Sequence, residues 1–120
     1  MKVAVTAQGK DMQSRSDPAF GRAKYFIVID TETGEFTVHD NKQNLNAVQG
    51  AGIQSGRNVA ELGVEAVITG NVGPKAFATL NASGIKVYIG SDGTVAEALE
   101  RFKAGKLECA GQASVEGHWV

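Results

Sequence analysis

The order of five short apolar runs most strongly limits what this chain can fold into. Each run is rich in β-branched or aromatic residues and has the length of a buried strand. The runs occupy residues 2–7, 25–30, 35–39, 66–69 and 85–89. Turn residues at 31–34 join the second and third runs and predict an antiparallel hairpin. Helix-length segments separate the later runs, which predicts strand–helix–strand crossovers.

Three segments have the apolar spacing of amphipathic helices. They begin near Gly52, Pro74 and Ser91 and extend to about residues 62, 83 and 104. Gly63, Gly84 and Gly105 are placed to end these helices. A proline in the first turn suits the second helix. Ser91 or Asp92 is expected to cap the third helix.

Together these elements predict an α/β fold. Because crossovers are right-handed, we expect a mixed five-stranded sheet of order 3-2-1-4-5, with strand two antiparallel and three helices. This topology resembles ribonuclease H-like domains. The domain is expected to span residues 1–107, with a C-terminal tail at 108–120. Chain direction switches between strands one and four, where open α/β sheets bind ligands.

Charge and cysteine content exclude several classes of protein. The formal net charge of −1 over 120 residues argues against a nucleic-acid binder that relies on general basicity. A single cysteine, Cys109, rules out an internal disulfide or a multi-cysteine cluster, and a lone thiol suits a reducing cytosol. No segment approaches the ~20 apolar residues of a membrane span. We therefore expect a cytoplasmic protein without nucleic-acid or membrane partners.

Polar loops and glycines collect at the edge where the parallel strands end. One polar stretch runs from Gln8 to Arg22 and a second covers residues 40–49. Helix N-termini at this edge would favour an anionic ligand, and glycines would allow close approach to the backbone. Any single glycine would also suit a tight strand-to-helix turn. The candidate cofactor-binding residues are Gln8, Gly9, Arg22, Asn41, Gly50, Gly52, Gly70, Asn71 and Gly73.

Two residues are candidate metal ligands. His39 ends the third strand at the same edge, and its imidazole is a competent iron ligand; it is equally suited to be an exposed strand-end histidine. Cys109 is a softer ligand, but the third helix should carry it to the opposite edge unless the tail doubles back. Met12 and His118 are weaker candidates. Arg22 is expected either to pair with an anionic ligand or to pack on the hairpin.

Catalytic arrangements are not found in the sequence. The glycine-rich segment at 50–56 lacks the preceding strand and following acid of a dinucleotide fingerprint. Two-metal nuclease chemistry needs clustered carboxylates, whereas Asp30 and Asp40 fall at opposite ends of the hairpin. Two histidines and no nucleophile elbow do not assemble a Ser–His–Asp triad. We therefore expect that the protein is not an enzyme.

The order of several segments between Lys2 and Leu107 resembles the dinitrogenase iron–molybdenum cofactor-binding family. These segments are DPAFGRA at 17–23, YF at 25–26, GAG at 50–52, GNVGPKA at 70–76 and GIKVY at 84–88. The resemblance implies a ribonuclease H-like fold that binds, stores or delivers the iron–molybdenum cofactor or an iron–sulfur cluster precursor. It also implies a cluster-assembly or recipient protein as partner. The alternative is a regulatory module that binds a partner protein through the same loops without metal.

Overall fold

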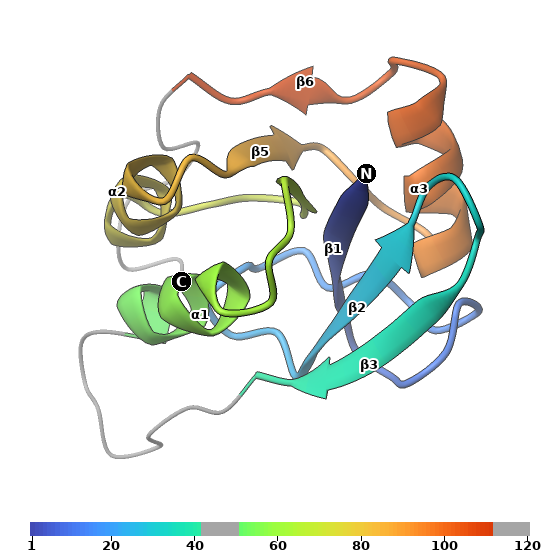
Figure 1. Ribbon diagram of the computed structural model, residues 1–120, viewed down its shortest axis with the longest axis horizontal. Helices are drawn as coiled ribbons and strands as arrows, with labels where there is room; N and C mark the ends of the chain where they lie inside the picture. The colour runs from blue at the N-terminus through green and yellow to red at the C-terminus, as the bar shows by residue number, and fades with distance from the viewer. Residues whose placement is uncertain (42–50, 112–120) are drawn as a thin grey trace.

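The computed structural model describes residues 1–41 and 51–111 (Figure 1). Over these residues the chain forms six strands and three helices in a mixed α/β arrangement. The strands are β1 (Lys2–Ala7), β2 (Tyr25–Asp30), β3 (Phe36–Asp40), β4 (Ala66–Ile68), β5 (Lys86–Ile89) and β6 (Glu108–Cys109). The helices are α1 (Ala51–Ala60), α2 (Pro74–Ala82) and α3 (Val95–Lys103). None of the helices in this part of the chain could cross a bilayer.

The sheet has the order β3-β2-β1-β4-β5-β6. Strand β2 is antiparallel to β1 and β3, β4 is parallel to both of its neighbours β1 and β5, and β6 is antiparallel to β5. The predicted order of the first five strands and the antiparallel second strand are confirmed. The prediction of five strands is wrong, because β6 adds to β5 with Cys109 opposite Tyr88. A two-residue strand is too short to leave a periodic pattern in the sequence. The ribonuclease H-like assignment stays a prediction.

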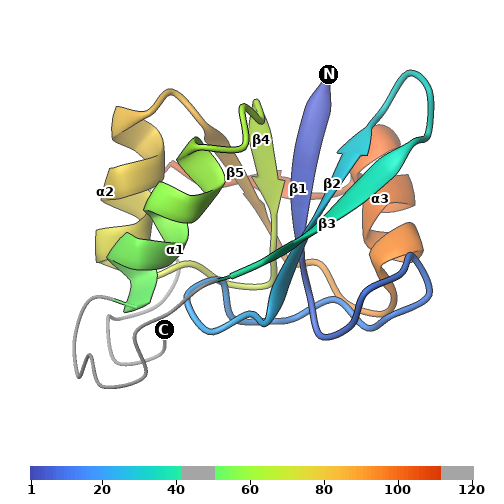
Figure 2. The same cartoon turned by 60° about the horizontal axis from the view of Figure 1, so that its bottom comes forward.

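Helices cover both faces of the sheet (Figure 2). Successive residues of β4 show the two layers: Val67 belongs to the core cluster on the α1 and α2 side, which includes Leu80. Ile68 belongs to the cluster on the α3 side, which includes Leu99. Because both faces are buried, the central strands need apolar residues at every position, which explains their continuous apolar runs.

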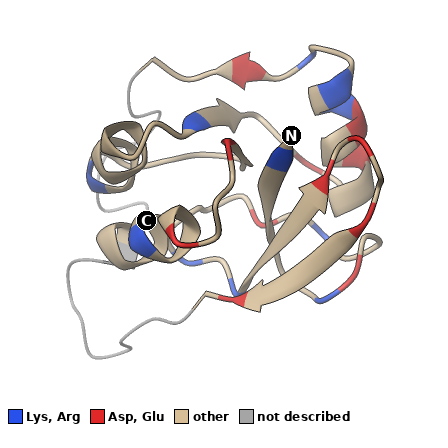
Figure 3. Ribbon diagram, in the orientation of Figure 1, with Lys and Arg blue, Asp and Glu red and all other residues tan. Residues whose placement is uncertain are grey.

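Residues of both charges are distributed over the described part of the chain (Figure 3). Two ion pairs are formed within the described residues. The N-terminal amine lies 4.0 Å from the carboxylate of Glu32, and Arg101 pairs with Asp92. Exposed pairs of this kind contribute little to stability. The two apolar layers therefore provide most of the favourable free energy of folding.

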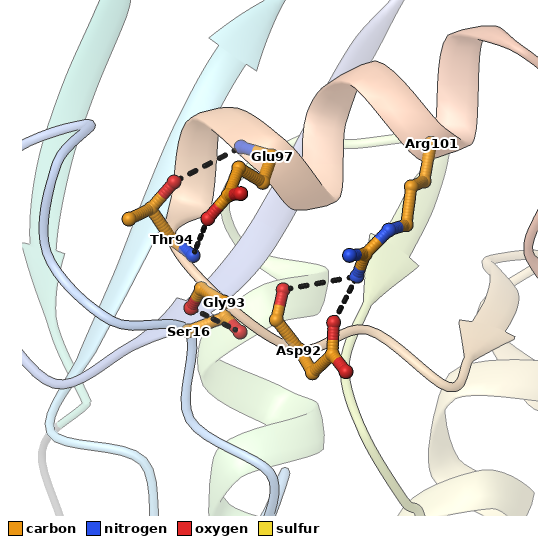
Figure 4. A network of polar contacts seen from close by, with 6 residues as sticks. All are labelled: Ser16, Asp92, Gly93, Thr94, Glu97 and Arg101. Atoms are coloured by element: carbon orange, nitrogen blue, oxygen red, sulfur yellow. Dashed lines mark hydrogen bonds and ion pairs between the residues drawn. The ribbon is translucent and has the colours of Figure 1, made fainter.

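Helix α3 begins with a capping box (Figure 4). The Thr94 hydroxyl accepts a hydrogen bond from the Glu97 amide at 3.1 Å, and the Glu97 carboxylate accepts one from the Thr94 amide at 2.9 Å. The prediction that Ser91 or Asp92 caps this helix is wrong. Gly93, with φ of 76°, makes a left-handed turn between those residues and the helix, so the cap falls on the next residue.

The capping box makes stability depend on pH. The backbone N–H of Thr94 lowers the pKa of the Glu97 carboxyl below its ordinary value of 4.5. A carboxyl with a lowered pKa contributes stability that is present above its unfolded-state pKa and is lost as pH falls through the folded-state pKa. We expect Glu97→Gln to be less stable than the wild type at neutral pH, with a difference that shrinks below about pH 4.5. Urea unfolding across this range measures it, and a difference that does not change with pH would contradict the account.

Candidate functional site

The ends of several strands and the starts of all three described helices gather at one edge of the sheet (Figure 2). Ala7 at the end of β1 and Asp40 at the end of β3 both lie opposite Tyr25. Helices α1, α2 and α3 begin on this side. We call this region the loop edge and define it as residues 8–24, 41, 51–54, 69–76 and 90–94. The predicted convergence of the loop at 8–22 and of the helix starts is therefore confirmed, whereas most of the second predicted loop, at 40–49, lies outside the described residues.

The first half of the loop between β1 and β2 covers the start of α3. The Val95 amide donates to the Ser14 carbonyl at 2.9 Å, and the Ala96 amide donates to the Met12 carbonyl at 2.9 Å. With the Glu97 amide held by the capping box, the first N–H groups of α3 already have acceptors within the protein. The sequence predicted that three helix N-termini face a ligand. Because the N-terminus of α3 is occupied by the loop, only those of α1 and α2 remain as candidates among the described helices.

The second half of the same loop packs on the connection between β4 and α2. The Asn71 amide donates to the Pro18 carbonyl at 2.8 Å, and the Phe20 amide donates to the Asn71 carbonyl at 3.2 Å. A Cβ atom on Gly70 would lie 2.7 Å from Pro18 Cα. Gly70 and the backbone of Asn71 thus hold the loop in place. The group that comes close enough to require a glycine at position 70 is the Pro18 backbone, not a ligand.

The first turns of α1 and α2 lie side by side. A Cβ atom on Gly52 would lie 3.1 Å from the Ala76 Cβ and 3.3 Å from the Ala76 nitrogen. Helix α2 has Gly73 as its N-cap, no side-chain cap, and Pro74 in its first turn. Neither of these two described turns contains an acidic residue. The partial positive charges at the two helix starts therefore add, and they favour a bound anion.

A buried polar cluster joins the end of β3 to α1 and the loop. Asn41, which is 7% exposed, donates through Nδ2 to the Ala23 carbonyl at 2.8 Å and to the Ser55 Oγ at 2.9 Å. Ser55 in turn donates to the Gly21 carbonyl at 2.9 Å, and Asn58 Nδ2 donates to Asn41 Oδ1 at 2.9 Å. This cluster fixes the backbone on both sides of residue 22. The sequence analysis did not identify Ser55 and Asn58, although polar residues on the inner side of an amphipathic helix were a usable signal.

The other predicted contact residues at the loop edge have different surroundings. Arg22 is exposed, and the Asn41 cluster holds the residues before and after it. Gln8 is exposed, whereas a Cβ atom on Gly9 would lie 2.3 Å from the Ser14 Oγ. Gly50 lies outside the described residues. The assignment of these residues as ligand contacts stays a prediction.

The two predicted metal ligands lie on opposite edge strands. His39 in β3 is half-buried, and its Nε2 lies 2.9 Å from the Thr37 Oγ1. Cys109 is exposed in β6, so the tail does return to the sheet. Because four strands separate β3 from β6, His39 and Cys109 cannot bind the same ion. Over the described ranges, no three His, Cys, Asp or Glu side chains are grouped to hold a metal ion. His118 lies outside them.

An open depression of about 630 Å³ lies at the other end of the sheet, around the β2–β3 hairpin. It is lined by Lys2, Val28, Asp30, Gly34, Glu35, Phe36 and Thr37. The backbone N–H of Glu32 lowers the pKa of the Asp30 carboxyl, so this group is ionised at neutral pH. Two carboxylates and one amine make the depression unfavourable for an anion, in contrast to the loop edge.

Comparison with known proteins shows similarity along nearly the whole chain. The dinitrogenase iron–molybdenum cofactor family matches residues 1–105. An uncharacterized protein of Methanocaldococcus jannaschii is 34% identical over 110 residues, which cover 90% of each chain. The apo form of the orange protein of Desulfovibrio gigas is 38% identical with a TM-score of 0.90, covering 95% of this chain and 96% of that one. A Thermotoga protein that has been proposed to be NifB is 37% identical with a TM-score of 0.78, covering 97% of this chain and 98% of that one.

The close packing at Gly70 predicts a large effect of a single methyl group. In Gly70→Ala the new Cβ atom would lie 2.6 Å from the Pro18 carbonyl oxygen, so the loop backbone must move. We expect a loss of about 1–3 kcal/mol in the free energy of unfolding, as for other overpacked sites. Gly111→Ala is the control, because nothing lies within 4 Å of its added Cβ atom. Equal stability of the two variants in urea unfolding would contradict the packing role.

The Asn41 cluster predicts that Asn41→Ala destabilises the free protein. The substitution removes three hydrogen bonds and leaves buried partners unsatisfied, which should cost about 2–3 kcal/mol. Asn81→Ala, at an exposed position of α2, should change stability little. The comparison is made by urea unfolding without added ligand. If Asn41→Ala were as stable as Asn81→Ala, the cluster would not be what holds this part of the loop edge.

Proposed function

Because this chain belongs to the dinitrogenase iron–molybdenum cofactor family, we propose that it is a small carrier domain for an anionic metal–sulfur cofactor. The cargo is the iron–molybdenum cofactor or an iron–sulfur cluster precursor, bound reversibly at the loop edge. The role is binding, storage or delivery, and the protein does not catalyse a reaction. The family match over residues 1–105, together with the similarity to the orange protein and to the proposed NifB protein of Thermotoga, supports a metal-containing cofactor.

One observation carries this proposal: the first turns of α1 and α2 lie side by side and contain no acidic residue. Two aligned helix starts place backbone N–H groups and partial positive charge at a single location. The exposed side chain of Arg22 adds a full positive charge at the same edge. A polyanionic cluster matches this arrangement, whereas a neutral or cationic ligand does not.

The interactions proposed to bind the cofactor suit a cargo that must be released. Backbone amides and a guanidinium bind an anion through hydrogen bonds and charge, without a permanent metal–ligand bond. His39 is the candidate for a direct bond to iron, and its replacement by alanine should weaken retention. An assembly or recipient protein is the proposed partner. The exposed thiol of Cys109 suits a reducing compartment, for which we propose the cytoplasm.

The proposal predicts retention of a metal–sulfur anion under anaerobic conditions. Tetrathiomolybdate, or ferrous iron with sulfide, is added to the protein, unbound material is removed, and metal and protein are counted. We expect retained metal and a new charge-transfer absorption. Arg22→Gln should weaken binding roughly three- to tenfold, with a loss that grows smaller at high salt because exposed charges are screened.

Arg57→Gln is the matched control for this experiment. Arg57 is also exposed, but it lies in the last turn of α1, away from the helix start. Its replacement removes the same charge and should leave binding unchanged. Absence of retained metal with both probes would contradict the proposal, and specific capture of a partner protein by the metal-free chain would then favour a regulatory interaction module.

A further inference from the structure

The Ser91 side chain is buried without a hydrogen-bond partner. Ser91 is 5% exposed, and its hydroxyl is the one buried side-chain polar atom, over residues 1–41 and 51–111, that has no partner. An unsatisfied buried hydroxyl destabilises the folded state. Native proteins keep few such groups, and each requires an explanation, such as a bound molecule. Alanine would fill nearly the same space without this cost.

Neighbouring buried hydroxyls at the same edge are satisfied. Thr6 Oγ1 lies 2.7 Å from the Asp17 carbonyl and 3.0 Å from Thr69 Oγ1. Ser16, which is 6% exposed, donates through Oγ to the Gly93 carbonyl at 3.2 Å (Figure 4). The interior of the loop edge is therefore organised well enough to pair its hydroxyl groups. The unpaired state of Ser91 is a local exception.

Backbone hydrogen bonds place Ser91 beside the connection that leads into α2. The Ser91 amide donates to the Thr69 carbonyl at 3.2 Å, and the Gly90 amide donates to the Gly70 carbonyl at 3.0 Å. Gly73, the N-cap of α2, follows within the same short connection. Ser91 thus lies beside the first residues of the connection that ends at one of the two helix starts, where the proposed cargo would bind.

The nearest acidic side chain in the sequence is kept neutralised. Asp92 is exposed, and its carboxylate and backbone carbonyl both accept from Arg101 of α3 (Figure 4). The ion pair offsets the negative charge of Asp92 close to the binding edge. The uncharged hydroxyl of Ser91 can donate a hydrogen bond to an anion, and the pairing of Asp92 with Arg101 weakens the repulsion that its carboxylate would otherwise exert.

We infer that Ser91 is a direct contact for the cargo, with its hydroxyl donating a hydrogen bond to a terminal sulfur or oxygen atom of the bound anion. This inference rests on the proposed function and assigns one residue of the binding site. The ligand supplies the acceptor that the protein lacks. A hydroxyl donates without adding charge, so it favours cargo with an exposed acceptor atom at this position over a cluster whose sulfurs are all bridging.

Ser91→Ala and Ser83→Ala test the inference as a pair of serine-to-alanine variants, one at the loop edge and one at the opposite end of α2. Each variant and the wild type are unfolded in urea without ligand and then titrated anaerobically with tetrathiomolybdate. We expect Ser91→Ala to be at least as stable as the wild type when free and to bind the probe roughly tenfold more weakly. Ser83→Ala loses a hydrogen bond of 3.1 Å to the Thr79 carbonyl at the C-terminal end of α2, outside the loop edge, so it should be no more stable when free and bind with unchanged affinity.

The outcomes separate this inference from the proposed function. If the wild type and Ser91→Ala bind the probe equally, Ser91 is not a contact and the carrier function stands. If Ser91→Ala is clearly less stable than the wild type without ligand, or fails to fold, the hydroxyl has an internal partner such as a trapped water, and the inference is overturned. If the wild type binds neither this probe nor ferrous iron with sulfide, both are overturned.

Discussion

The attachment of the loop at residues 8–24 to the end of the sheet is the constraint on which the rest of the structure depends. Thr6 holds its centre, since the Asp17 amide donates to the Thr6 carbonyl at 2.8 Å and the Thr6 hydroxyl lies 2.7 Å from the Asp17 carbonyl. From there one arm of the loop closes the start of α3 and the other packs on the connection to α2. The starts of α1 and α2 remain as the pair of positive helix ends. The loop therefore determines where an anion can bind.

The sequence predicted the strands and their order well because burial on both faces leaves a clear apolar signal, as in residues 25–30. It did not predict β6, whose pairing depends on where the tail returns to the sheet. It predicted the location of the loop edge but not the roles of its residues. Gly52 allows α1 and α2 to pack closely, and Gly70 allows the loop to pack on the connection before α2. The side-chain amide of Asn41 is hydrogen-bonded within the protein. A glycine that approaches a ligand and one that approaches a backbone look alike in a sequence.

The proposed cargo would be held differently from the metal of a permanent metalloprotein. His39 and Cys109 are on opposite edge strands, and over the described ranges no group of three side chains can hold a metal ion. Charge, backbone amides and a neutral hydroxyl are weaker and more easily exchanged than thiolate ligation. Such a site suits a protein that receives a preassembled cluster and releases it.

The location of a bound metal tests the central claim most directly. Crystals grown anaerobically with tetrathiomolybdate allow molybdenum to be located by its anomalous scattering. The account predicts one main peak at the loop edge, next to the first turns of α1 and α2 and within hydrogen-bonding reach of Ser91 through a sulfur atom. A main peak at the depression by the β2–β3 hairpin, or at the exposed sulfur of Cys109, would contradict it.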